Sequence, residues 1–534
     1  MKNNSLSLKK SILLVLVPVF LILLLASACS TGEKEKTQPR RPNIVYIMSD
    51  DHGYQAMSCY NGGLNKTPNL DRIADGGVIF TRAFVTNSLC SPSRAALLTG
   101  KFSNKNGLYI NRGGHNDFDT AQMTFPKLLH RAGYQTAMIG KWHIKSMPVG
   151  FDYWNILPGQ GQYYNPDFIE MGERKRHEGY VTNLITDFAL QWLQQRDTTR
   201  PFLLMMHEKA PHRPWMPDTA TFHLFEEEQF PVPDNYFDDY AGRRAAREQK
   251  MSVIKDMDLA YDLKMVDKEG EIKTRYRPYI EGMLKRLTPQ QRAAWDREYD
   301  PKIRAFKEAH LKGKELAVWK LRRYLSDYLR CVASVDMNVG RLLDYLEKEG
   351  LMKNTIVVYS SDQGFYLGEH GYFDKRFMYE ESFRTPLIMH YPGFVRKGKI
   401  NALVQNIDFA PTFLDYAGVT VPQEIQGVSL KPLLQQNTPP AGWRKALYYH
   451  YYEFPCEHFT RRHYGIRTDR YKLIRFYYDF DEWEFFDLQS DPHEMHNLYH
   501  DAAYGRVIDS LKAGLDSLRR MYGDTLPDPA YISQ

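Results

Sequence analysis

The sequence predicts an α/β fold: a large mixed, mostly parallel β-sheet flanked by helices, followed by a smaller antiparallel sheet with one helix. Apolar, β-branched runs of strand length alternate with segments of helical period, which is typical of parallel sheets. Ionisable residues follow four of these runs directly. From about residue 440 the chain becomes aromatic and strand-like, and it closes on an amphipathic segment at 503–522.

The N-terminal segment is typical of an export signal. Three lysines within the first ten residues precede the apolar run ILLVLVPVFLILLLASAC. The letters ASAC place small residues before Cys29 and resemble the box at which bacterial lipoproteins are cleaved and lipidated. We therefore expect a signal peptide at 1–29 that ends at lipidated Cys29, a polar tether at 30–41, and a lipoprotein exported to the periplasm or outer membrane. A plain signal peptide and an uncleaved membrane anchor are the alternatives.

The composition narrows the possible partners. The 534-residue chain has a formal net charge of +6 without a block of Lys and Arg, so no nucleic-acid partner is expected, whereas an anionic substrate is compatible. With Cys29 and Cys90 set aside, the remaining cysteines are Cys59, Cys331 and Cys456, and no CxxC pair occurs. A disulfide framework and a structural zinc site are therefore not expected.

Four buried parallel strands are predicted, at 43–49, 135–140, 202–207 and 355–361. The residues that follow them are Asp50 and Asp51, then Lys141, Trp142 and His143, then the segment EKAPHRP with His212, and finally Asp362 and Gln363. Because the carboxyl ends of parallel strands share one edge of a sheet, these side chains are expected to converge on a crevice. Ordinary solvated loop ends are the alternative.

The domain organisation follows from shifts in composition. A catalytic domain is expected at 42–439 and a C-terminal subdomain at 440–534. Between about 220 and 325 the chain becomes charged and helix-favouring, which predicts a helical insertion at the edge of the sheet.

Carboxylates at the strand ends indicate a metal site. Asp50, Asp51 and Asp362 would repel one another unless a cation neutralised them, and Gln363 adds an amide oxygen. An all-oxygen set suits Ca²⁺, with Mg²⁺ the less favoured ion because it demands strict octahedral geometry. For the two aspartates alone, a turn that caps a helix would be the simpler interpretation.

Cationic and proton-transferring groups are predicted in the same crevice. Lys141, His143, His212 and Lys375 would suit an oxyanion ester, since fixed donors hold its charge while a histidine moves a proton to the departing oxygen. A single histidine would more often be structural, but two at strand ends favour catalysis.

Cys90 opens the segment CSPSRAALLTG at the start of a short predicted helix, with Pro92 in its first turn and Arg94 one turn further on. A reactive thiolate or an unimportant buried thiol are two interpretations. Neither explains a sulfur beside a metal site made of oxygen ligands, since hard cations prefer oxygen. This mismatch suggests that the sulfur is converted to oxygen.

These residues resemble the type I, formylglycine-dependent sulfatase family of the alkaline-phosphatase superfamily. CSPSR is similar to its C-x-P-x-R signature, in which the cysteine becomes formylglycine. PNIVYIMSDDHG, GKWH, KAPHRP, SSDQG and DFAPTFLDYAGV follow in the family's order, so the resemblance covers nearly all of 42–534. It implies an alkaline-phosphatase-like sheet and a formylglycine-generating maturation enzyme as a partner. Gln363 departs from the asparagine of many relatives.

The resemblance also implies a role for each site residue. Calcium would be bound by Asp50, Asp51, Asp362 and Gln363 together with residue 90. His143 would serve the second hydroxyl of the hydrated formylglycine, and His212 would protonate the leaving oxygen. Lys141 and Arg94 would orient residue 90, and Lys375 would grip the sulfate.

The segment GEHGYFDKRFMYEESFRTPL resembles exported bacterial glycan sulfatases of the N-acetylglucosamine-6-sulfatase type. It implies a sulfated glycan substrate, most specifically 6-O-sulfated N-acetylglucosamine of heparan- or mucin-type glycans. Asp374, Arg376 and His458 are the candidate sugar contacts, with a structural salt bridge or a satisfied histidine as the alternative. Three other functions stay open: desulfation at another sugar position, phosphate or phosphonate hydrolysis on the same superfold, and glycan binding without catalysis.

Overall fold

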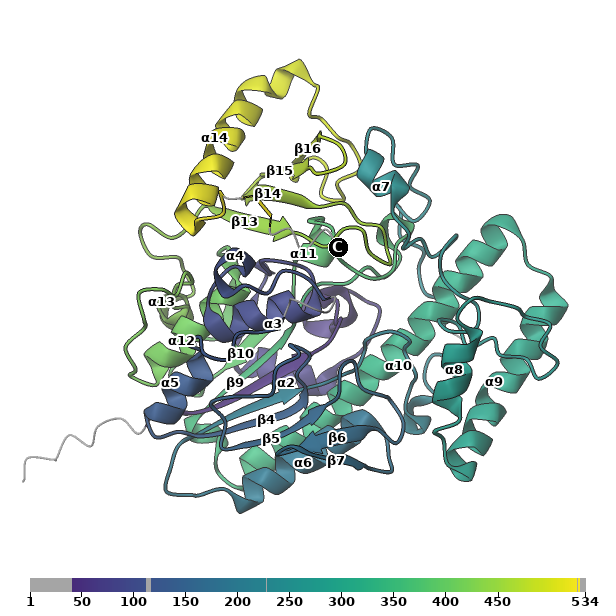
Figure 1. Cartoon of the computed structure of the whole chain (residues 1–534), viewed down its shortest axis with the longest axis horizontal. Coiled ribbons are helices and arrows are strands. Elements are labelled where there is room, and N and C mark those ends of the chain that lie inside the picture. Colours follow the sequence, from purple (N-terminus) through teal and green to yellow (C-terminus); the bar gives the residue numbers. More distant parts are fainter. Residues whose placement is uncertain (1–40, 112–116, 227, 526, 529–534) are drawn as a thin grey trace, which may run out of the picture. The chain divides into compact units, whose positions relative to one another are not determined.

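The centre of the protein is a ten-stranded mixed sheet in the order β11-β2-β10-β9-β1-β8-β4-β5-β6-β7 (Figure 1). Its strands, in that order, are β11 (Gly398–Ile400), β2 (Val78–Phe80), β10 (Leu387–His390), β9 (Thr355–Ser361), β1 (Asn43–Ser49), β8 (Phe202–His207), β4 (Gln135–Lys141), β5 (Tyr153–Leu157), β6 (Asp167–Glu170) and β7 (Glu173–Arg176). The structure is a computed structural model that describes residues 41–111, 117–226, 228–525 and 527–528. The expected signal peptide, lipidated Cys29 and the tether to residue 40 lie outside the described residues.

The four predicted strands are confirmed as the middle of this sheet. β9, β1, β8 and β4 are neighbours and run parallel, with Ile47 opposite both Met206 and Tyr359. All four strands are almost completely buried, which explains their continuous apolar sequences. Antiparallel pairing of β10 with β9 makes the sheet mixed.

Helices cover both faces of the sheet (Figure 1). The helices of the described chain are α2 (Pro68–Gly76), α3 (Cys90–Thr99), α4 (Ser103–Asn106), α5 (Phe125–Arg131), α6 (Val181–Gln195), α7 (Arg244–Glu248), α8 (Arg277–Leu284), α9 (Pro289–Ala309), α10 (Gly313–Lys348), α11 (Glu380–Phe383), α12 (Phe409–Tyr416), α13 (Lys431–Gln436) and α14 (Gly505–Tyr522). One face packs against α2, α6 and α10, and the other against α3, α5 and α12. Among the residues described, no helix is long and apolar enough to span a membrane.

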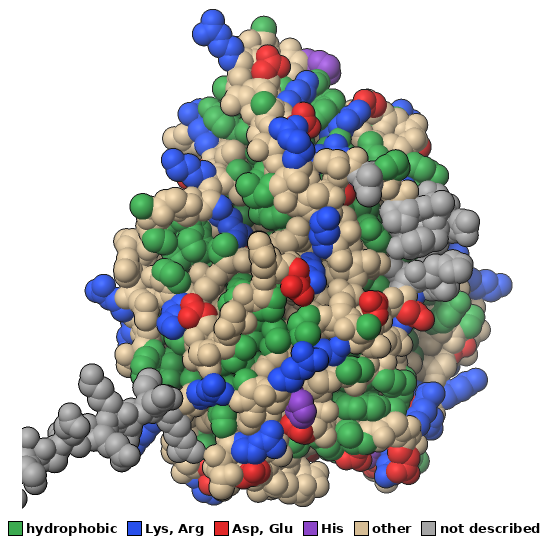
Figure 2. Space-filling view, turned by 60° about the vertical axis from the view of Figure 1, so that its left-hand side comes forward, with side chains coloured by type: hydrophobic (Ala, Val, Ile, Leu, Met, Phe, Trp, Pro, Cys, Tyr) green, Lys and Arg blue, Asp and Glu red, His purple; other side chains and the backbone are tan. Residues whose placement is uncertain are grey.

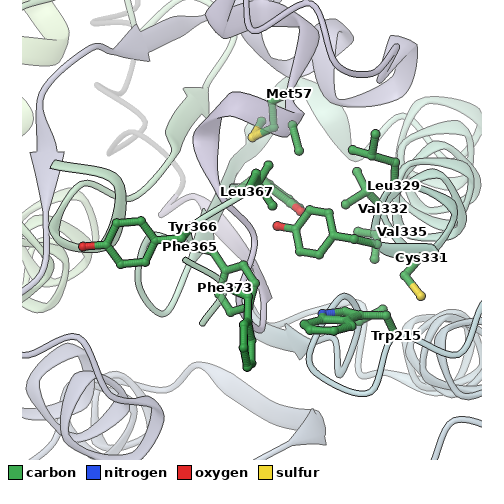
Figure 3. Close-up of a cluster of buried hydrophobic side chains, with 14 of the residues drawn as sticks. Met57, Trp215, Leu329, Cys331, Val332, Val335, Phe365, Tyr366, Leu367 and Phe373 are labelled. Atoms are coloured by element: carbon green, nitrogen blue, oxygen red, sulfur yellow. The ribbon is translucent and has the colours of Figure 1, made fainter. Parts of the chain in front are cut away.

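A hydrophobic cluster ties the loops after β8 and β9 to α10 (Figure 3). Trp215 follows β8 and packs against Tyr324 of α10, with ring centroids 4.6 Å apart, and against Phe373 at 6.3 Å. Figure 3 places Leu329 and Val332 of α10 around the same core. Long-range packing therefore anchors the two loops that carry His212 and Lys375.

Gly140 permits close approach of β4 to β8 at the edge where the site residues lie. Its φ is +101°, and a Cβ there would lie 2.0 Å from the carbonyl oxygen of His207. Only glycine fits such a position without displacing the backbone. The next residue in the chain is Lys141.

The C-terminal sheet is confirmed as a four-stranded antiparallel sheet with one helix. Its strands are β13 (Ala446–Tyr451), β14 (His463–Thr468), β15 (Tyr471–Phe476) and β16 (Glu482–Asp487). Leu511 and Leu515 of α14 pack on its apolar face with Ile466. Two further short strands, β3 (Ala83–Phe84) and β12 (Val404–Gln405), pair with each other.

Only part of the expected helical insertion at 220–325 is helical. Its second half forms α8, α9 and the start of α10, while α7 is the only α-helix that the structure describes between 222 and 276. Asp258 explains part of the difference, because its carboxylate accepts hydrogen bonds from the backbone N–H groups of Ala260 and Tyr261 and so competes with helical bonding. The expected boundary near 325 falls inside α10, a helix that covers the sheet.

Charges of both signs are interspersed on the face of the protein that Figure 2 presents. Figure 2 shows Lys and Arg side chains separated by acidic, apolar and uncharged ones over the face it presents.

Candidate active site

Three carboxylates meet at the carboxyl edge of the central strands. Asp50 and Asp51 follow β1 and Asp362 follows β9, and one oxygen from each lies within 4.8 Å of the others. All three side chains are buried. The backbone N–H of Asp51 donates to Oδ1 of Asp362 at 3.2 Å, so parallel pairing of β1 with β9 sets the cluster directly.

Each of these carboxylates has a buried cationic partner. Lys141 pairs with Asp50, Nζ of Lys375 lies 2.5 Å from Oδ1 of Asp51, and Nη2 of Arg94 lies 2.9 Å from Oδ2 of Asp362. Three like charges in one buried cluster are costly without such compensation. The pairs show why cationic residues are needed at this edge.

Gln363 supplies a further oxygen. Its amide nitrogen donates to Oδ1 of Asp51 at 2.5 Å, while its Oε1 is buried without a hydrogen-bond partner in the described chain. Buried amide oxygens without a hydrogen-bond partner are rare in folded proteins, so a ligand for this oxygen is expected. Beside three carboxylates, it fits a hard divalent cation such as calcium. The donor set therefore suits the metal that the sequence predicts.

Cys90 is the first residue of α3 and is completely buried. Its Sγ lies 3.4 Å from Oδ1 of Asp50, and the two residues form a second possible metal-ligand group with His212. Burial raises the pKa of the Cys90 thiol, so the unmodified side chain is protonated and a poor nucleophile. This environment counts against a simple cysteine hydrolase.

Arg94 connects three elements around Cys90. Its guanidinium binds Asp362 through Nε and Nη2, and its Nη1 donates to the carbonyl oxygen of Lys141 at 2.6 Å. It lies one turn along α3 from Cys90. A buried, fully engaged arginine fixes α3 against the ends of β4 and β9.

His212 faces the carboxylates with one ring nitrogen. Its Nε2 lies 3.7 Å from Oδ2 of Asp51, while its Nδ1 lies 2.7 Å from the carbonyl oxygen of Arg213. The carbonyl can only accept, so Nδ1 carries a proton and Nε2 is the nitrogen that serves the site. Burial and then the neighbouring charges of Lys141 and Lys375 hold the pKa of His212 well below its usual value.

His143 lies close enough to the same cluster for the charges of Lys141, Arg94 and Asp362 to act on its imidazole. Burial, Lys141 and Arg94 hold its pKa well below the ordinary value, so its imidazole is neutral and can accept a proton. Its Nδ1 is buried and has no hydrogen-bond partner among the residues described. Its backbone carbonyl accepts from the hydroxyl of Ser91 at 2.6 Å, which ties the end of β4 to the first turn of α3.

A pocket of about 670 Å³ opens beside these groups and contains His212 and Lys375. The three residues predicted to contact sugar lie together on its wall. Nε of Arg376 lies 3.1 Å from Asp374, and Nε2 of His458 lies 3.3 Å from the same carboxylate. They are thus salt-bridged to one another and also line the pocket. A larger groove of about 770 Å³, lined by Phe225, Phe306 and Trp319 among others, contains none of the predicted residues.

Sequence reasoning missed three polar residues of the site. Gln160 accepts from Nζ of Lys141 at 2.5 Å, the Tyr163 hydroxyl donates to the carbonyl of His212 at 2.5 Å, and Glu453 lies 2.8 Å from Nη1 of Arg376. Gln160 and Tyr163 follow β5, a strand that was not among the four predicted. A search of the residues after every strand of the sheet would have included them.

Two family profiles match the chain. The profile described as Sulfatase matches residues 42–419, and the C-terminal profile of N-sulphoglucosamine sulphohydrolase matches 368–521. An N-acetylglucosamine-6-O-sulfatase of Bacteroides thetaiotaomicron is 51% identical over 509 residues, which cover 94% of this chain and 90% of that protein. The human N-acetylglucosamine-6-sulfatase is 26% identical over 442 residues, or 78% of this chain and 68% of that protein.

Solved structures show the same fold. A complex described with its substrate D-glucosamine-2-N,6-O-disulfate superimposes with a TM-score of 0.88 at 50% identity, covering 92% of this chain and all of that one. A phosphonate monoester hydrolase of Agrobacterium radiobacter superimposes with a TM-score of 0.65 at 19% identity, covering 90% and 96%. The second likeness concerns the fold alone.

Proposed function

The chain belongs to the sulfatase family, and from that membership we propose that it removes 6-O-sulfate from N-acetylglucosamine residues of heparan- or mucin-type glycans. The proposal includes a formylglycine made from Cys90 by a maturation enzyme and a calcium ion bound beside it. The observation that carries it is the position of Cys90, with its sulfur 3.4 Å from a carboxylate of an oxygen-rich cluster. The 51% identity to an N-acetylglucosamine-6-O-sulfatase supports the choice of sugar.

The residues that would hold the metal are Asp50, Asp51, Asp362, Gln363 and residue 90. When present, calcium and the hydrated aldehyde would supply charge neutralisation at the sulfate oxygens and a hydroxyl nucleophile that a thiol cannot offer. The protein's own groups do the remaining work. Lys141 and Lys375 stand beside the cluster, paired with the carboxylates of Asp50 and Asp51, where their N–H groups would donate hydrogen bonds to residue 90 and to the oxygens of the anionic ester.

Two histidines divide the proton transfers. Nε2 of His212 faces the pocket and donates a proton to the oxygen of the departing sugar alcohol. Because burial and then the neighbouring cations lower the pKa of His212, the negative charge of a bound sulfate ester is needed to favour its charged form. The neutral imidazole of His143 would take a proton from the side chain of residue 90 as sulfate is released.

The pocket wall supports recognition of a sugar. Asp374, Arg376 and His458 offer a carboxylate, a guanidinium and an imidazole within one hydrogen-bonded group, which suits the hydroxyls of a pyranose. Glu453 holds Arg376 from behind. These contacts restrict the rotation of each side chain, so little conformational entropy is lost when a sugar binds.

The first experiment is mass spectrometry of the peptide that contains residue 90, combined with a sulfate-release assay. Conversion of the thiol to an aldehyde lowers the peptide mass by about 18 Da. The expected result is that mass loss together with sulfate release from N-acetylglucosamine-6-sulfate. An unconverted Cys90 in active protein would refute the nucleophile, and release only from sugars sulfated elsewhere would refute the 6-O position. A preference for phosphate or phosphonate over matched sulfate esters would refute sulfatase activity.

Export as a lipoprotein is a separate part of the proposal. The run of small residues before Cys29 supports it, and a lipid there would hold the exported enzyme at a membrane, either facing the periplasm or at the outer membrane. Labelled palmitate should enter the full chain and not the Cys29→Ala variant. Equal labelling of both proteins would refute the anchor.

A further inference from the structure

The candidate pocket extends outward from the catalytic groups along an aromatic wall. The expected insertion contributes Tyr261, Tyr276 and Tyr279 to the pocket. Ring centroids are 6.0 Å apart between Tyr261 and Tyr276, and again 6.0 Å apart between Tyr276 and Tyr279. Tyr279, at the outer end, is 65% exposed. A row of rings that ends in an exposed tyrosine presents flat apolar surface to whatever occupies the pocket mouth.

Two uncompensated cations stand on the same wall. Lys250 and Arg275 line the pocket and are exposed, and in the described part of the chain no carboxylate lies within 4.0 Å of either charged group. The guanidinium of Arg275 lies 5.1 Å from the ring centroid of Tyr276. By contrast, the deeper arginines of the pocket are already paired, Arg213 with Asp262 and Arg376 with Glu453. Glu457, a half-exposed carboxylate of the same pocket, lies 3.3 Å from Nη1 of Arg213, so among the described residues no ion pair neutralises Lys250 or Arg275.

This outer wall is not needed for the sugar that loses its sulfate, because the proposed contacts to that sugar lie deeper, at Asp374 and Arg376. We propose that the wall is a subsite for a second, acidic sugar residue joined to the first, with its ring on Tyr276 and Tyr279 and its carboxylate near Lys250 and Arg275. The inference rests on the proposed function. An N-sulfate on the first sugar offers a similar negative charge, but the rings of the wall favour a second pyranose.

The test compares three substrates: N-acetylglucosamine-6-sulfate alone, the same sugar linked to a uronic acid, and the same sugar linked to a neutral hexose. The variant is the double substitution Lys250→Ala with Arg275→Ala. The matched control is Lys255→Ala with Lys273→Ala, which removes two exposed lysines from the same segment outside the pocket. We expect the pocket variant to lower kcat/KM on the acidic disaccharide by about threefold to tenfold, which lies within the range for two exposed ion pairs.

Further results separate charge from stacking. The loss should be smaller on the neutral disaccharide and the monosaccharide, and it should shrink at high ionic strength, because exposed charges are screened. Tyr279→Ala should lower kcat/KM on both disaccharides more than on the monosaccharide. Equal losses on all three substrates, or the same losses in the control variant, would overturn the subsite. So would a pocket-variant loss on the N-sulfated monosaccharide as large as that on the acidic disaccharide.

Failure of the proposed function would be seen separately. If the wild-type protein releases sulfate from none of the three compounds, the catalytic proposal fails while the subsite can still be measured. Calorimetric titration of the Cys90→Ala protein then compares the affinities for the acidic and the neutral disaccharide and so tests the subsite without turnover. Tighter binding of the acidic one, lost in the Lys250 and Arg275 double variant, supports the subsite, and equal binding refutes it.

Discussion

Asp262 accepts two hydrogen bonds from Arg213, the residue that follows His212 in the chain, at 2.6 and 2.9 Å. Both side chains are largely buried, and the guanidinium packs 5.0 Å from the ring centroid of Tyr261 and 5.3 Å from that of Phe373. The carbonyl of Arg213 in turn fixes the Nδ1 proton of His212. Asp262, which does not line the pocket, thus helps to orient the imidazole of His212 through Arg213.

Asp262→Asn should therefore slow the departure of poor leaving groups. Loss of the charge weakens both bonds to Arg213, so the loop of His212 gains freedom and proton donation becomes less efficient. We expect kcat to fall about tenfold on sugar sulfates, a part of the roughly 10²–10⁴-fold that general-acid catalysis contributes, and to fall less on aryl sulfates, whose phenolates leave unaided. The measurement is kcat across a series of sulfate esters that differ in the pKa of the leaving alcohol.

Asp267→Asn is the matched control. Asp267 is also buried and binds Arg277 at 2.7 Å in the same segment, but neither residue lines the pocket. This variant should lower Tm without changing the dependence of kcat on the leaving group. If both variants give the same uniform loss across the ester series, Asp262 has only a structural role.

Asp362→Ala should remove bound metal and activity together. Its carboxylate accepts from Arg94 and from the backbone of Asp51, and its removal also leaves the Arg94 guanidinium without its principal partner. We expect metal affinity to fall by more than about a hundredfold, beyond the effect of altering a residue that only supports a ligand. Elemental analysis of purified protein measures the metal content. Full metal occupancy in an inactive variant would contradict the assignment of Asp362 as a ligand.

Glu453→Gln should weaken sugar binding more than catalysis. One oxygen of Glu453 lies 2.8 Å from Nη1 of Arg376, and the other accepts from the backbone N–H of Asn111 at 3.2 Å. Neutralising it loosens Arg376, so KM for the sugar sulfate should rise about tenfold, as a weakened charged hydrogen bond implies. Steady-state kinetics on a sugar and an aryl sulfate test this. A fall in kcat with unchanged KM would exclude the positioning role.

The central strands of the sheet were predictable because strands buried on both faces have continuous apolar sequences. β1, β4, β8 and β9 read as continuous apolar runs, since both of their faces are covered by helices. The edge strands carried no such signal. β7, with the sequence ERKR, is exposed throughout and is a strand only because β6 pairs with it.

The site was predictable where it depends on strand ends and not where it depends on packing between distant segments. Asp51 and Asp362 approach because parallel pairing of β1 and β9 requires it. The contact of Asp374 with His458 requires the C-terminal part to fold against the catalytic domain, which no local pattern encodes. The support of Arg376 by Glu453 is of the same kind, and chain separation alone hides it.

Glu484 is a buried residue of β16, and its carboxyl group should destabilise the fold at alkaline pH. Its Oε2 accepts from the Tyr379 hydroxyl at 2.8 Å, its Oε1 has no partner among the described residues, and burial raises its pKa from 4.5 to about 8. The folded state therefore holds a proton that the unfolded chain releases above pH 4.5, so this contribution to stability is complete below pH 4.5 and is lost as pH rises through 8. In Glu484→Gln the side chain stays neutral, and its Tm relative to wild type should increase steadily between pH 5 and 8.5, corresponding to a few kcal/mol. Glu349 is exposed, so the control variant Glu349→Gln should keep a constant difference in Tm from wild type over the same pH range. If the Tm of Glu484→Gln also runs parallel to that of wild type, Glu484 is ionised in the folded protein and the prediction is wrong.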